Sequence, residues 1–190
     1  MLFTPVLAQA RHTLGFTLLE CLFTVGILAL VASAARVGVG EVLAHRRVDL
    51  QVWQIRRALE LTRSTARAQQ RVWTLCLADD RSRCVLEGAT RLLIFLDADL
   101  SRQHNVGEPI VRDLNVDEHR LSIRLFASRR RYVRFAATGD ALESGNFLVF
   151  WGDKKNTYQR QVVFYRSGRI RLSAALDVDN AYFNRCQKTA

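Results

Sequence analysis

The sequence predicts an α+β fold in which a long N-terminal helix packs on antiparallel β-sheets. Residues 16–70 contain no proline and have apolar residues at helical spacing, whereas from residue 71 onward short β-like runs alternate with turn residues. The 190 residues are 49% hydrophobic and include ten Gly and two Pro, a composition typical of one ordinary domain and not of a disordered or fibrous chain.

The first part of the predicted helix is strongly apolar. Residues 16–35 contain one charged side chain, Glu20. With a rise of about 1.5 Å per residue, this stretch is long enough to cross roughly 30 Å of hydrocarbon, so we expect a single transmembrane span. A cleaved secretory signal is the alternative, since residues 8–10 (AQA) resemble a cleavage site. That site precedes the apolar run, whereas secretory signals are cut after it.

The second part of the predicted helix, residues 41–70, contains neither Pro nor Gly and carries one apolar stripe. The stripe residues follow one another at steps of three and four, the spacing that places side chains on one helix face. They are Val48, Val52, Ile55, Leu59, Thr62 and Ala66. Arginines occupy much of the remaining surface. The stripe therefore predicts that this part of the helix lies on a folded domain.

Short runs of β-forming residues follow the helix, separated by turn signals such as Asp79-Asp80, Thr138-Gly139-Asp140 and Ser167-Gly168. The runs cover residues 72–78, 90–97, 120–127, 130–137, 146–151, 159–166 and 169–173. Runs this short at this spacing predict antiparallel sheets that cover the helix stripe.

Glu20 is an ionisable residue inside the apolar stretch, where a carboxylate is costly and needs a partner. A cut between Gly15 and Phe16 creates an α-amino group four residues before Glu20. The amine of one subunit can then neutralise the glutamate of the next, which gives a register for assembly. The alternative is a span whose end lies near the membrane interface, where Glu20 reaches the headgroups.

Residues 15–20 (GFTLLE), followed by the apolar helix, resemble the class III signal of type IV pilins and pseudopilins. The resemblance implies cleavage after Gly15 by a prepilin peptidase, N-methylation of Phe16 and a role of Glu20 in filament assembly. It also implies a leader over residues 1–15, a transmembrane and filament-packing helix over 16–44, and a periplasmic pilin-like domain over 45–190. Basic residues near the span, such as Arg36, favour a cytoplasmic domain; we follow the resemblance and expect a single-pass inner-membrane protein with a periplasmic domain.

The resemblance continues through the rest of the chain. The segments ALELTRSTARAQQRVWTLC, LLIFLDAD, VRFAATGD and VVFYRSGRIR, in this order, resemble the FimT/GspH group of minor pilins and pseudopilins. It implies a pilin-like fold, with other minor and major pilins as partners. GspH-like members belong to type II secretion pseudopili, whereas some FimT-like members bind DNA during natural transformation. A DNA-binding minor pilin, a GspH-like minor pseudopilin and a purely structural minor pilin that primes filament assembly are therefore the functions to distinguish.

The chain is basic: 28 basic residues against 18 acidic ones give a formal net charge of +10, and only three of the basic residues are lysine. The excess lies after residue 44. The basic excess suits DNA binding by phosphate neutralisation, although a solvated surface or attraction to anionic lipid explains it equally well.

Arg169 and Arg171 are two apart on a predicted strand, and Arg166 lies just before the turn, so all three are expected at one hairpin tip. Residues 168–171, beginning with Gly168, match the Gly-Arg-x-Arg motif of the DNA-binding FimT-like members.

A second basic cluster lies in residues 128–134, where Arg129, Arg130 and Arg131 are consecutive. Beside the hairpin, this cluster would extend a DNA-binding groove, with Tyr132 stacking on a base. On the opposite face, it would be a solvated edge that discourages strand pairing. Lys154 and Lys155 are a weaker third candidate.

The cysteines predict one disulfide. Cys76 and Cys84 flank a turn sequence that brings two hairpin arms together, and the resemblance implies a cysteine pair at this position in an oxidising periplasm. Free thiols or a pairing with Cys186 are the alternatives. We expect Cys21, in the apolar stretch, to be a small apolar filler.

One acidic segment has the ligand spacing of a calcium loop at positions 1, 3, 5, 7, 9 and 12. The matching residues are Asp97, Asp99, Ser101, Gln103, Asn105 and Glu108. Position six is Arg102 and not the glycine that such a turn requires, so we expect a solvated acidic loop and no metal. The four histidines are scattered and no catalytic motif is evident, so we expect neither an enzyme nor a cofactor.

Overall fold

The computed structural model describes residues 16–116, 121–151 and 158–173, without the side chains of residues 34–39 and 41. The chain divides into two units, Met1–Glu41 and Val42–Ala190, which are described separately. The predicted leader with Gly15, the pair Lys154 and Lys155, and Cys186 lie outside the described residues.

Helix α1 spans Leu18–Gln69. Its start is capped by Thr17, whose hydroxyl oxygen accepts a hydrogen bond from the backbone N–H of Glu20 at 3.3 Å. The order Thr-x-x-Glu is typical of a helix start, because the hydroxyl satisfies an amide that has no partner within the helix. Glu20 thus lies in the first helical turn.

In the first unit, the apolar side chains of α1 are exposed. They include Leu18, Leu19, Leu22, Phe23, Val25, Ile27, Leu28, Leu30 and Val31, and Phe16 before the helix is exposed too. Among the described residues, no helix combines the length and the apolar character that a membrane crossing requires, so the span predicted over residues 16–35 is not confirmed.

In the second unit, α1 packs through the stripe that the sequence predicts. All six stripe residues, Val48, Val52, Ile55, Leu59, Thr62 and Ala66, are at most 3% exposed. The five apolar residues among them belong to a core that also takes apolar side chains from both sheets. The α+β prediction of a helix packed on antiparallel sheets is therefore confirmed, and its physical basis is the helical spacing of these residues.

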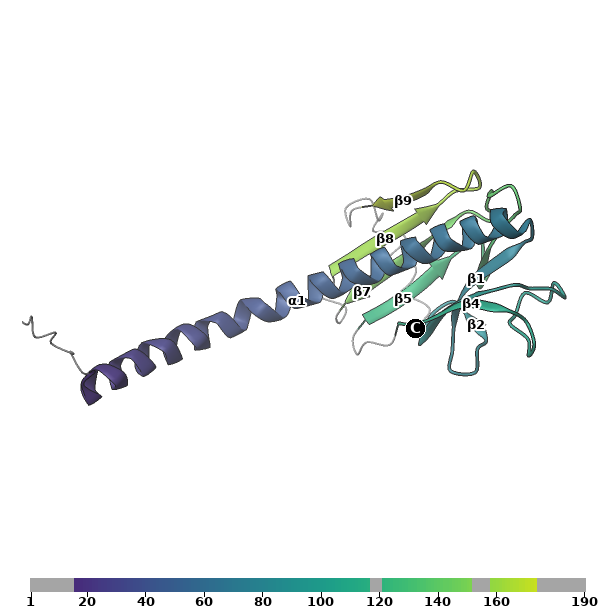
Figure 1. Cartoon of the computed structure of the whole chain (residues 1–190). Coiled ribbons are helices and arrows are strands. Elements are labelled where there is room, and N and C mark those ends of the chain that lie inside the picture. Colours follow the sequence, from purple (N-terminus) through teal and green to yellow (C-terminus); the bar gives the residue numbers. More distant parts are fainter. Residues whose placement is uncertain (1–15, 117–120, 152–157, 174–190) are drawn as a thin grey trace, which may run out of the picture. The chain divides into compact units, whose positions relative to one another are not determined.

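The strands form two antiparallel sheets, as Figure 1 shows. The first has the order β2-β1-β3-β4, with β6 also paired to β1, and the second has the order β5-β7-β8-β9. The strands are β1 (Trp73–Ala78), β2 (Cys84–Val85), β3 (Arg91–Phe95), β4 (Ile110–Asn115), β5 (Leu121–Phe126), β6 (Tyr132–Phe135), β7 (Gly145–Trp151), β8 (Tyr158–Phe164) and β9 (Ile170–Ser173).

Strand β1 is buried on both faces, which explains why all of its residues except Thr74 are apolar. Leu75 and Leu77 point into the main core with the helix stripe. The alternate residues Cys76 and Ala78 join a second, smaller core. That core also contains Cys84, Leu93, Phe95 and Tyr132. A strand with a period of two thus separates two apolar layers.

Each of the seven predicted runs contains a strand, but two strands were missed. Strand β2 has only two residues. Strand β4 pairs only with β3 and is exposed at most positions, so its sequence IVRDLN lacks the alternation that marks a half-buried strand.

Candidate nucleic-acid interface

Strands β8 and β9 form the predicted hairpin, and residues 165–169 make its turn, which we call the hairpin tip. The N–H of Tyr165 donates to the carbonyl oxygen of Arg169 at 3.0 Å, and the N–H of Gly168 donates to that of Tyr165 at 2.9 Å. Gly168 has φ +73°, a conformation that favours glycine. Arg166 and Arg169, on either side of the Ser167-Gly168 pair, are both exposed.

The side chains of strand β9 alternate as the sequence predicts. Arg171 is exposed, whereas Ile170 and Leu172 pack against the main core. One Nη of Arg171 donates to the hydroxyl of Ser173 at 3.4 Å. The hairpin thus exposes arginines at its tip and on one face of its last strand.

The hairpin tip rests on a second turn and on the last part of α1. A Cβ atom added to Gly168 would lie 2.3 Å from the carbonyl oxygen of Gly139 and 2.8 Å from the Nε of Arg63. The same Nε donates to the Gly139 oxygen at 2.9 Å. Gly139 has φ +88°, and a Cβ atom added to it would lie 2.6 Å from the Cδ of Arg67. The two turns therefore meet backbone to backbone beside the end of the helix (Figure 1).

This contact adds two arginines that the sequence reading missed. Arg63 is partly buried and Arg67 is exposed, and both lie next to the glycines that support the hairpin tip. The sequence shows that Arg63 and Arg67 lie on the helix, but nothing in it indicates that the two turns pack against them. Among the described residues, no ion pair involves either of them or Arg166 or Arg169. The exposed carboxylate of Asp140 lies in the supporting turn and accepts a hydrogen bond from Thr138 at 2.8 Å.

The second predicted cluster is organised around a buried carboxylate. Glu143, whose side chain is 2% exposed, forms ion pairs with Arg130 at 2.6 Å and with Arg134 at 2.7 Å. Its other oxygen accepts the backbone N–H of Arg134 at 2.8 Å. Arg130 therefore shares this carboxylate with Arg134, while its own side chain is still 45% exposed, and its role in DNA binding stays a prediction.

Tyr132 is not available for stacking on a base, contrary to the expectation from the sequence. It is 7% exposed and belongs to the smaller core. The guanidinium of Arg134 lies over its ring, 5.2 Å from the centroid.

The three consecutive arginines have three different surroundings. Arg129 is exposed in a tight turn with φ +65°. Arg130 pairs with Glu143. Arg131 lines a cavity of about 350 Å³ together with Arg83 and His104, beside the disulfide. The run therefore does not act as one unit. The segment that carries Glu143 contacts the hairpin tip. The carbonyl oxygen of Arg166 accepts the N–H of Ala141, two residues before Glu143.

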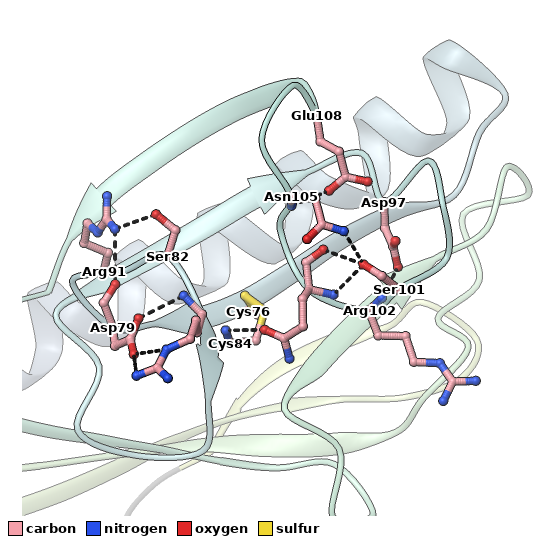
Figure 2. The surroundings of a disulfide bond; sticks show 12 residues. Cys76, Asp79, Ser82, Cys84, Arg91, Asp97, Ser101, Arg102, Asn105 and Glu108 are labelled. Atoms are coloured by element: carbon pink, nitrogen blue, oxygen red, sulfur yellow. Dashed lines mark hydrogen bonds and ion pairs between the residues drawn. A yellow bond between two sulfur atoms is a disulfide. The ribbon is translucent and has the colours of Figure 1, made fainter.

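Cys76 and Cys84 form a disulfide, with their Cα atoms 5.5 Å apart, as the sequence predicts. Figure 2 shows the turn that it closes. There Asp79 accepts hydrogen bonds from the backbone N–H of Arg83 at 2.9 Å and from its guanidinium at 2.7 Å. These donors hold the pKa of Asp79 below its ordinary value. Among the described cysteines, Cys21 alone has a free thiol, and it is exposed.

Of the residues predicted for processing and assembly, Phe16 and Glu20 are described. Both are exposed, on either side of the Thr17 cap.

Comparisons with known proteins place the chain in a family. The sequence model of the GspH family, described as type II transport protein GspH, matches residues 51–168, more than half of the chain. The structure is similar to a crystal structure of the Pseudomonas aeruginosa (strain PAO1) type IV minor pilin FimU in space group P21, with a TM-score of 0.52, 15% identity and coverage of 70% of this chain and 92% of that chain. A second crystal structure of FimU, in space group P65, has a TM-score of 0.47, 16% identity and coverage of 66% and 92%.

No curated protein matches the chain. The family model covers the second part of α1 and the sheets up to the hairpin tip. The chain therefore belongs to the GspH family of minor pilins and pseudopilins and has the type IV pilin fold.

Proposed function

We propose that this protein is a minor type IV pilin whose exported domain binds DNA without sequence preference through the hairpin tip, for DNA uptake in natural transformation and for pilus assembly. One observation carries the proposal: Arg166 and Arg169 flank an exposed turn and form no ion pair with any described residue. Arg171 is exposed two residues further along. Guanidinium groups bind phosphate oxygens through paired hydrogen bonds and need no base readout.

The charge of the whole chain supports the same function. The formal net charge is +10, and the basic excess lies after residue 44, in the domain that carries the hairpin. A cationic domain attracts a polyanion over a distance of about 10 Å at moderate salt. Arg63 and Arg67 lie beside the tip and extend its positive charge along the helix end.

Anchoring and assembly follow from the start of the chain. We infer that a prepilin peptidase cuts between Gly15 and Phe16, that Phe16 is then methylated, and that Glu20 pairs with the amine of a neighbouring pilin. Family membership supports an inner-membrane anchor and incorporation into a pilus or pseudopilus. The exposed apolar surface of residues 16–33 suits both environments, since lipid or neighbouring helices would cover it.

Binding to unrelated DNA duplexes tests the proposal, with the detergent-solubilised full chain titrated across salt and followed by fluorescence anisotropy. The unaltered protein should bind all duplexes alike and lose affinity steeply with salt. The double variant Arg169→Ala, Arg171→Ala should lower the slope of log affinity against log salt by about two, because two phosphate contacts are lost.

The matched control is the double variant Arg57→Ala, Arg112→Ala, which removes two exposed arginines from α1 and β4. It changes the net charge equally but leaves the hairpin intact, so it should keep most of the affinity and slope. Equal losses in the two double variants would show that only net charge matters and would refute the hairpin site.

A second candidate function is favoured by the description of the family as a type II transport protein. On this reading, the chain is a GspH-like minor pseudopilin of a type II secretion system, or a purely structural minor pilin. The domain would then co-purify with other pilins or pseudopilins and show no salt-dependent DNA binding.

A further inference from the structure

The loop between β3 and β4, residues 97–108, brings three carboxylates together, and we call it the acidic loop. Oxygen atoms of Asp97, Asp99 and Glu108 all lie within 4.8 Å of one another. Among the described residues, no arginine, lysine or histidine forms an ion pair with any of them. Three like charges at this distance repel one another, so a positive charge between them would stabilise the loop.

Asp97 provides an independent indication of a ligand. It is 4% exposed, and its Oδ1 atom is buried without a hydrogen-bond partner among the described residues. Its Oδ2 atom accepts the backbone N–H of Arg102 at 3.0 Å. A buried carboxylate oxygen without a donor is costly, and a bound cation removes that cost.

The hydroxyl of Ser101 lies beside the carboxylates. Figure 2 shows Ser101 and Asn105 beside Asp97 and Glu108. The Nδ2 of Asn105 donates to Asp99 at 2.8 Å and to the hydroxyl of Ser101 at 2.9 Å, and so holds these two groups together. The loop therefore gathers carboxylate and hydroxyl oxygens, the hard ligands that calcium prefers.

Glu108 closes the acidic loop from its far end. Its two carboxylate oxygens accept the backbone N–H groups of Ala98 at 2.8 Å and of Asn105 at 2.9 Å. Each oxygen keeps a further lone pair for a metal ion.

Arg102 does not prevent the turn, contrary to the expectation from the sequence. It adopts φ +67°, the left-handed conformation that glycine provides at position six of a calcium loop. Its side chain is exposed, and Figure 2 shows it directed away from Asp97 and Ser101. The guanidinium is thus removed from the place where a cation would lie.

We propose that the acidic loop binds one calcium ion through Asp97, Asp99 and Glu108, with the hydroxyl oxygen of Ser101 as a further ligand. The ion occupies the space between the three carboxylates and cancels their repulsion. Calcium is favoured over magnesium because the loop offers many oxygens with the spacing of known calcium loops, whereas magnesium keeps most of its water. The site is independent of the hairpin tip and of DNA binding.

The test uses the full chain, freed of divalent ions with EDTA and dialysed. Calcium chloride should give a calorimetric binding curve with one ion per chain and a dissociation constant of about 0.1 to 1 mM, as in extracellular calcium modules. Saturating calcium should raise the melting temperature by a few degrees. Magnesium chloride at the same concentration, and sodium chloride at the same ionic strength, should have much smaller effects.

Asp99→Asn and Glu108→Gln remove one carboxylate each and should weaken calcium binding by about tenfold or more. The matched control is Asp140→Asn, which alters an exposed carboxylate outside the loop and should leave calcium binding unchanged. If a variant fails to fold, its melting curve without calcium shows it, and the other variant carries the test.

Three results would overturn the proposal. The first is the absence of heat and of a melting shift at millimolar calcium. The second is an equal response to magnesium. The third is a combined result: Asp97→Asn stabilises the calcium-free protein, and calcium has no effect on the unaltered chain. The carboxyl group of Asp97 would then share a proton with Asp99 instead of binding a metal.

Discussion

The hairpin tip and the cluster around Glu143 are both rich in arginine, yet their arginines are held differently. At the tip, Arg166 and Arg169 are exposed and form no ion pair with the described residues. In the cluster, Arg130 and Arg134 share the carboxylate of Glu143, which is almost completely buried. The difference shows that a run of arginines does not by itself make an anion site, because a buried carboxylate can offset part of the charge and hold the side chains in place.

The two regions also differ in what they contribute to the fold. The Glu143 pairs hold the entry to β7 against β6 and so belong to the structure. Arg166 and Arg169 of the tip form no ion pair with the described residues. Gly168 of the tip, in contrast, packs closely against Gly139 of the supporting turn. In the tip, then, the backbone provides stability and the side chains are available for function.

The largest effect is expected from Glu143→Gln, which removes the buried charge while keeping the shape of the side chain. Arg130 and Arg134 lose their counter-charge, so the free energy of unfolding should fall by about 3 kcal/mol. The expected fall is not larger because both guanidiniums keep some access to solvent. Urea unfolding measures the change. In the control Glu60→Gln, the half-exposed pair with Arg56 is lost, and the change should be within about 0.5 kcal/mol. Equal effects would mean that the buried pairs do not stabilise the fold.

A smaller effect is expected from Gly168→Ala. The new Cβ would approach the Gly139 oxygen to 2.3 Å at a positive φ, so the free energy of unfolding should fall by about 2 kcal/mol. Gly88→Ala is the matched control, since Gly88 has φ +67° but open space around its Cα, and only the backbone cost of about 1 kcal/mol is expected. Thermal and urea unfolding compare the two variants. If they are equally stable, the two turns do not pack as described.

The smallest effect is expected from Arg130→Ala on DNA binding. Since Glu143 holds this guanidinium and offsets part of its charge, the slope of log affinity against log salt should change by less than about 0.3. Arg169→Ala should lower the same slope by about one. Anisotropy titrations with one duplex measure both. A larger loss for Arg130→Ala would reverse the ranking of the two regions.

Much of the fold could be predicted from the sequence, because the decisive signals are local. The steps of three and four in α1 predict its buried stripe, and each of the seven predicted runs contains a strand. Strand β4 was missed because it is an exposed edge strand whose residues need no alternation. The hairpin turn was predictable since Ser167-Gly168 is a local turn signal.

The surroundings of the site depend on contacts between distant residues, and these could not be predicted. Nothing near Arg130 in the sequence indicates that Glu143 will be buried beside it. Arg63 is separated from Gly139 by 76 residues, and only the tertiary fold brings them together. Arg102 shows the converse, since its identity argued against a turn that the surrounding loop nevertheless imposes.

The close contact between Gly139 and Gly168 has a consequence for how relatives of this protein can diverge. Gly168 does not accept a side chain without moving the Gly139 turn or Arg63, and Gly139 does not accept one without moving Arg67, so the backbone there tolerates little change. Arg166, Ser167 and Arg169 carry exposed side chains and are under no such restriction. Homologues can thus acquire or lose affinity for a polyanion by exchanging these three residues, while the same scaffold is inherited unaltered.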